Sequence, residues 1–66
     1  MSSDLINDEW TKLRTLVESI ELDVKKNAAG NASAGIRARR GLREIKKAAA
    51  TLIKNTIDAE KARKGD

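Results

Sequence analysis

The sequence predicts an all-α fold, an antiparallel two-helix hairpin that dimerises into a four-helix bundle. Apolar residues recur at coiled-coil spacing in both halves of the chain. The pair Gly30-Asn31 lies between the two halves and suits a tight turn. Proline, which breaks helices, is absent. The 66 residues suffice for a single helical-hairpin domain, residues 1–66.

The first helix is expected over residues 3–28. Its apolar residues alternate at steps of four and three, which places them along one stripe of a helix. Asp4 near the start, and Lys25 and Lys26 near the end, suit the helix dipole. Leu16 widens the stripe on one side. The stripe itself consists of Ile6, Trp10, Leu13, Val17, Ile20 and Val24.

The turn is expected at residues 29–31, where the apolar spacing stops. Gly30 is suited to the left-handed conformation that often follows the last helical residue. Asn31 is suited to cap the start of the next helix, because its side-chain oxygen accepts a free backbone N–H.

The second helix is expected over residues 32–62, followed by a frayed tail at 63–66. Gly35 and Gly41 each weaken it by about 1 kcal/mol relative to alanine. Close approach of another backbone or of a phosphate would explain them, and so would sequence drift without a structural role. The apolar stripe of this helix reads Ala38, Leu42, Ile45, Ala49, Leu52, Thr56 and Ala59.

Self-association is expected because a chain this short buries little apolar surface. Ordering costs roughly 1.5 kcal/mol per residue. The chain has no cysteine for a disulfide, no histidine, and Trp10 as its one aromatic residue. We expect a homodimer in which these side chains form the core or the dimer contact: Ile6, Trp10, Leu13, Val17, Ile20, Val24, Leu42, Ile45, Ala49 and Leu52.

Charge is distributed unevenly along the chain. Residues 1–24 hold six acids and two bases, a balance of −4, whereas residues 25–66 hold twelve bases and four acids, a balance of +8. At about 100° per residue, most bases of the second helix form one stripe, roughly 100° round from its apolar residues. The predicted nucleic-acid-binding residues are Arg37, Arg39, Arg40, Arg43, Lys46, Lys47 and Lys54.

A basic stripe on a helix matches the regular negative charge of a nucleic-acid backbone, so duplex DNA is the expected partner. No sequence-reading motif is present, and no aromatic platform for stacking bases exists. Binding is therefore expected to be sequence-independent. The alternative is a helical protein-interaction module (a scaffold, an antitoxin or a phage-type adaptor) that does not bind DNA. A basic helix lying on a membrane surface is a third reading, which the acidic first helix disfavours.

Other classes of function find little support. Acidic pairs lie on polar helix faces, so the sequence predicts no catalytic residue and no enzyme. We expect no metal, no cofactor and no small-molecule substrate. No apolar run reaches the roughly 18 residues of a membrane span. Nothing resembles a signal peptide, and a cytoplasmic, nucleoid-associated protein is expected.

Residues 16–61 resemble the chlamydial histone H1-like family of small bacterial nucleoid proteins. The resemblance covers about two-thirds of the chain. It is carried by Leu-Val-Glu-Ser-Ile at 16–20, Gly30-Asn31 before an Ala-rich step, Arg37-x-Arg39 or Arg40, Ile45, and Lys54-x-x-Ile57-x-Ala59-Glu60-Lys61.

The resemblance implies an architectural protein that compacts DNA and has a helical N-terminal region. It places Arg37, Arg39 and Arg40 on the basic surface. The chain departs from the chlamydial form because the long Lys/Ala-rich tail is absent, and only residues 61–64 correspond to its beginning. It looks like a short member of the family, whose affinity for DNA would have to come from the helical body.

Overall fold

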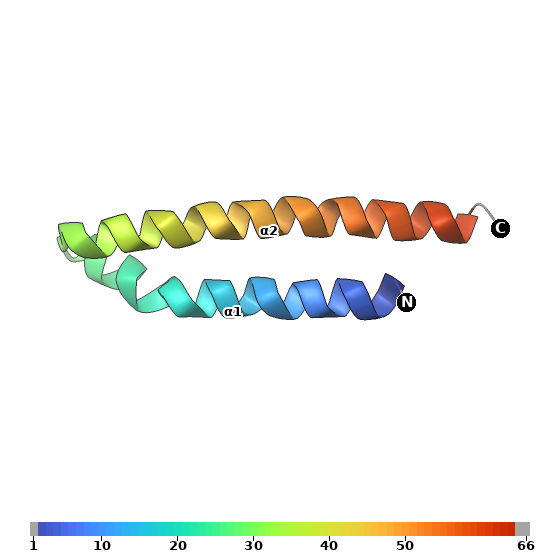
Figure 1. The fold of residues 1–66 in the computed structure, drawn as a ribbon. Coiled ribbons are helices and arrows are strands. Elements are labelled where there is room, and N and C mark those ends of the chain that lie inside the picture. The colour runs from blue at the N-terminus through green and yellow to red at the C-terminus, as the bar shows by residue number, and fades with distance from the viewer. Residues whose placement is uncertain (1, 65–66) are drawn as a thin grey trace.

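The fold is an antiparallel hairpin of two helices. The structure, a computed structural model, describes residues 2–64. α1 spans Ser2–Ala28 and α2 spans Ala32–Lys64, side by side in a rod whose Cα atoms extend over 54 × 15 × 12 Å (Figure 1). The predicted all-α hairpin is confirmed. Residues 63 and 64 belong to α2, whereas residues 65–66 of the expected frayed tail lie outside the described part.

The turn between the helices follows the local chemistry of its residues. Gly30 has a positive φ of 108°, the left-handed conformation that glycine adopts without a steric cost. The N–H of Gly30 donates to the Asn27 carbonyl over 2.9 Å, and that of Asn31 to the Lys26 carbonyl over 3.0 Å. This pair of bonds is a Schellman motif. The Asn31 side chain then accepts from the Ala34 N–H over 2.9 Å and caps α2.

The helices contact each other along one stripe of each. On α1 the least exposed side chains follow the heptad spacing, but they include two acids. On α2 they are mostly small. The α1 stripe consists of Ile6, Glu9, Leu13, Leu16, Ile20 and Asp23. The α2 stripe consists of Ala34, Gly35, Ala38, Gly41, Ile45, Ala48, Ala49, Leu52, Asn55, Thr56 and Ala59.

This contact is rotated relative to the stripes that apolar spacing predicts. Trp10, Val17 and Val24 of α1 are 51%, 48% and 42% exposed, and Leu42 of α2 is 49% exposed. The cause is the row of small residues on α2. Alanine and glycine there allow the α1 side chains to approach the α2 backbone closely. α1 therefore packs against this row, and bulkier side chains such as Leu42 lie beside the contact and not within it.

Two polar pairs cross the helix contact near its ends. Arg37 Nη2 lies 3.0 Å from Asp23 Oδ1, and the Arg37 Nε–H donates to the same oxygen over 3.1 Å. At the other end, the Asn55 side-chain amide donates to the Glu9 carboxylate. Each pair can form only when its two residues lie at the same height along the hairpin. Together the two pairs therefore fix the axial register of α1 relative to α2.

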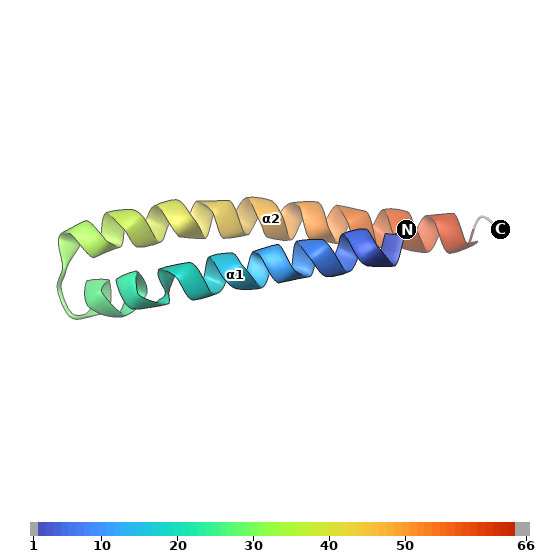
Figure 2. The same cartoon turned by 60° about the horizontal axis from the view of Figure 1, so that its bottom comes forward.

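The hairpin has a small core. Among the described residues, the buried apolar side chains are Ile20, Ala34, Ala38 and Ala59, and no large side chain is completely buried. α2 also continues past the start of α1, so its last turns have no helix beside them within this chain (Figure 2). Neither helix is long and apolar enough, over the residues described, to cross a membrane.

Candidate nucleic-acid interface

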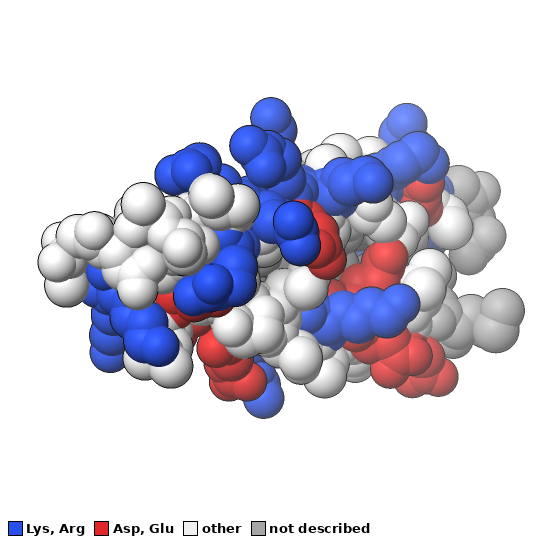
Figure 3. Space-filling model, turned by 60° about the vertical axis from the view of Figure 1, so that its left-hand side comes forward, with Lys and Arg blue, Asp and Glu red and all other residues white. Residues whose placement is uncertain are grey.

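Six of the seven bases predicted to bind nucleic acid lie on the side of α2 that faces away from α1. At about 100° per residue, they cluster opposite the row of small residues that contacts α1. All are exposed. Figure 3 shows basic side chains along the upper side of the molecule, over α2. We call these residues the basic stripe: Arg39, Arg40, Arg43, Lys46, Lys47 and Lys54.

The stripe lies farther from α1 than the sequence predicts. Apolar spacing places it about 100° from the helix contact. The contact with α1 is centred on Ala34, Gly41 and Ala48 and not on Leu42. The basic stripe therefore lies on the side of α2 opposite this contact. A straight duplex could therefore lie along α2 without meeting α1.

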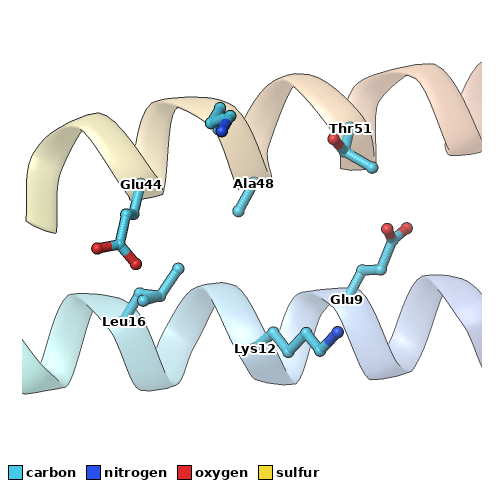
Figure 4. A pocket seen from close by; sticks show the side chains of 7 residues that line it. Glu9, Lys12, Leu16, Glu44, Ala48 and Thr51 are labelled. Atoms are coloured by element: carbon cyan, nitrogen blue, oxygen red, sulfur yellow. The ribbon is translucent and has the colours of Figure 1, made fainter.

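Glu44 interrupts the basic run in the sequence and lies at its border in space. It points toward α1 into an open groove between the helices, of about 370 Å³ (Figure 4). Leu16 and Ala48 form the floor of this groove, and Glu9 reaches into it from α1. Glu44 follows Arg40 by one helical turn and lines the same groove as Lys47, so it borders the stripe on one side while its carboxylate is turned toward α1.

Arg37 stands apart from the stripe. Its side chain is turned toward α1 and paired with Asp23, whose side chain is only 22% exposed. A guanidinium that already holds a carboxylate with two of its nitrogens has fewer donors left for a phosphate. The structure therefore separates Arg37 from the arginines with which the sequence grouped it.

Lys54 lies within the stripe but has a partner of its own. Its ammonium group is 2.9 Å from the Asp58 carboxylate, one helical turn further on. The hydrogen bond to Asp58, followed by the charge of Asp58, raises the pKa of Lys54 above its usual value. Lys54 is thus fully charged at neutral pH, and Asp58 offsets that charge locally.

The remaining five bases have no ion-pair partner among the residues the structure describes. Arg39, Arg40 and Arg43 fall within two turns of α2, and Lys46 and Lys47 extend the stripe by one more turn. Sequence reasoning overlooked Ile36, an exposed apolar side chain on the same side of α2. A helical wheel centred on the arginines would have included it.

The predicted core and dimer residues divide into two groups. Six of them lie in the contact between the helices: Ile6, Leu13, Ile20, Ile45, Ala49 and Leu52. The other four are exposed: Trp10, Val17, Val24 and Leu42. Val17, Val24 and Leu42 line one open groove of about 350 Å³ whose floor includes Ile20 and Ile45. Both helices thus leave apolar side chains on the same face of the hairpin.

Comparison with protein families identifies the family of the chain. The family described as histone H1-like protein Hc1 matches residues 7–62. The chain belongs to this family. No curated protein and no solved structure matches the chain significantly.

The Hc1 match begins within α1, includes the turn and ends near the end of α2. A histone H1-like family supports a DNA-binding, nucleoid-associated role, and it is a structural family and not an enzymatic one. Within residues 2–64, no cluster of three or more potential ligands could hold a metal ion.

Proposed function

We propose that this member of the Hc1 family binds duplex DNA through the basic stripe of α2, without regard to sequence. The observation that carries the proposal is the row of exposed bases on the side of α2 opposite α1, five of which have no ion-pair partner among the described residues. Arginine binds phosphate oxygens with two donors at once, and lysine adds unpaired charge. Neither side chain on a rod of this kind requires a particular base.

Compaction follows from self-association. The hairpin leaves Trp10, Val17 and Leu42 exposed, and it has too small a core to account for a stable fold by itself. A homodimer would cover these side chains and present two basic stripes, the minimum for joining two DNA segments. The site of action is then the nucleoid.

Binding to a random-sequence duplex, measured by fluorescence polarisation at several salt concentrations, tests the proposal. Release of counterions makes the logarithm of affinity fall linearly with the logarithm of salt, by about 0.9 per phosphate contact. We expect a steep slope and equal affinity for duplexes of unrelated sequence. Retention of full affinity at high salt, or strong preference for one duplex, would contradict phosphate binding.

The triple variant Arg39→Ala/Arg40→Ala/Arg43→Ala locates the site. It should bind more weakly and with a salt slope lower by about 2 to 3, while its circular dichroism stays that of the parent.

The matched control is Lys12→Ala/Arg14→Ala/Lys26→Ala, which removes the same charge from exposed positions of α1. An equal loss of affinity in both triple variants would show that net charge, and not the stripe, determines binding. If the parent protein does not bind DNA even at low salt, the protein-interaction module becomes the better description.

A further inference from the structure

Several exposed apolar side chains lie on one long face of the hairpin, which we call the apolar face, whereas Leu5, Leu22 and Ile36 lie on other sides. Trp10, Val17 and Val24 come from α1, and Leu42 and Ile53 come from α2. Trp10 is one heptad before Val17, so it shares the side of α1 that forms the groove with Leu42. Glu21 and Lys25 also line that groove, but its surface is mainly apolar, and exposed apolar side chains grouped in this way mark a contact with another molecule.

The two long edges beside this face differ in charge. The basic stripe forms the edge along α2. The exposed side of α1, away from α2, carries both signs, with Asp4, Asp8 and Glu18 among Arg14 and Lys26. The apolar face therefore lies between a strongly basic edge and an edge of mixed charge.

Two symmetric arrangements bring the apolar face of one copy against that of another. A two-fold axis across the rod places α1 against α1 and α2 against α2, with both basic stripes side by side. A two-fold axis along the rod places each α1 against α2 of the other copy, with the basic stripes on opposite sides.

We infer that a second copy of this chain covers the apolar face in the second arrangement, with α1 of each copy against α2 of the other. Neighbouring helices in a bundle lie about 8–10 Å apart, close to the Debye length of about 8 Å at physiological salt. At that distance the net charges of adjacent helices still interact. The charged residues of α1 are six acids and four bases, a balance of −2, and those of α2 are ten bases and three acids, a balance of +7, so the inferred pairing is attractive and the other repulsive.

The arrangement determines how the dimer meets DNA, a step that rests on the proposed function of the basic stripe. Stripes on opposite sides cannot bind neighbouring phosphates of one straight duplex. Each would hold a separate duplex, and the dimer would bridge them. Side-by-side stripes would instead widen a single binding surface.

Disulfide trapping distinguishes the arrangements, because the natural chain contains no cysteine. With the two-fold axis along the rod, each residue of the second copy lies at the same height along the rod as the same residue of the first copy. Val17 and Leu42 line the same groove in one copy, so Val17 would face Leu42 of the second copy. With the axis across the rod and through the middle of the apolar face, Val17 would instead face Val17.

The experiment uses full-length Val17→Cys and Leu42→Cys proteins, mixed, equilibrated and oxidised without DNA. We expect most of the linked product to join one chain of each kind, with little product when either protein is oxidised alone. Thr15→Cys, on the exposed side of α1 away from this face, provides the background level of random linkage.

Dominant Val17→Cys self-linkage would overturn the inferred arrangement. So would linkage no greater than that of Thr15→Cys together with a monomeric mass in light scattering. Because no DNA is present, either failure is independent of whether the basic stripe binds DNA. A pull-down of one free duplex by another, immobilised duplex then tests bridging, which the wild type should support and a monomeric Val17→Glu variant should lose.

Discussion

The side chain of Ile20 occupies the space beside Gly41 where any other residue would place its Cβ. Both residues are buried, in the half of the hairpin nearer the turn. A Cβ added to Gly41 would overlap Ile20 Cγ2 and lie 3.4 Å from Ile20 Cβ. Close approach between the helices, and not a phosphate, therefore explains this glycine. The sequence left that choice open.

Gly41→Ala should destabilise the hairpin although alanine is the better helix former. The gain of about 1 kcal/mol in helix propensity is opposed by overpacking, which costs typically 1–3 kcal/mol. We expect a lower midpoint in thermal unfolding followed by circular dichroism. Ala50→Gly, at an exposed position of α2, measures propensity alone. If Gly41→Ala raises the midpoint by as much as Ala50→Gly lowers it, the contact with Ile20 has no energetic weight.

Arg37→Ala should affect stability more than DNA binding. Its ion pair with Asp23 joins the two helices, and partly exposed pairs contribute about 0.2–1 kcal/mol. Urea unfolding at fixed protein concentration measures that loss, and the exchanged variant Asp23→Arg/Arg37→Asp should recover part of it. In polarisation assays Arg37→Ala should bind DNA better than Arg39→Ala does. Equal losses of affinity would place Arg37 back in the interface.

The Glu9–Asn55 pair should reveal itself in a double-mutant cycle. Removing one partner leaves a half-buried polar group without its hydrogen bond, at a cost of about 1–3 kcal/mol. Replacing both residues by leucine should be neutral or stabilising, because it adds apolar contact. Urea unfolding of Glu9→Leu, Asn55→Leu and the double variant, each compared with the parent protein, provides the three changes in free energy of unfolding that the cycle requires. Additive effects would mean that the two side chains do not interact.

Trp10 should report dimer formation by its fluorescence. In a single hairpin the indole is half exposed to water, so its emission should lie at long wavelength when the protein is dilute. Burial in the dimer should shift the emission to shorter wavelength as concentration rises. Trp10→Ala should weaken the dimer while preserving helicity. An emission maximum that is constant across the dissociation range measured by light scattering would place Trp10 outside the contact.

Local signals in the sequence were sufficient for the helices and the turn. Gly30 and Asn31 act on their immediate neighbours, through a left-handed backbone and a capping side chain, so their roles are readable from residue type. The heptad positions Ile6, Leu13 and Ile20 likewise lie in the helix contact as their spacing predicts.

Which side of each helix contacts the other could not be predicted from residue types in the same way. Apolar spacing favours large side chains, so it counted Trp10 and Leu42 and ignored Ala34 and Ala48. The small residues decide the packing because they permit close approach, a property of the pair of helices. For the same reason the sequence grouped Arg37 with the other arginines. Its pairing with Asp23 depends on how the two helices are aligned.

The length of the hairpin sets what it could do to a chromosome. A rod of 54 Å laid along a duplex would cover roughly 16 base pairs at about 3.4 Å each. DNA stays nearly straight over about 50 nm, roughly ten times that length. A rod this short and straight has no curved surface around which DNA could be wrapped. Compaction of the chromosome would then depend on cross-links between DNA segments that are distant in sequence, and the degree of compaction would increase with the number of cross-links.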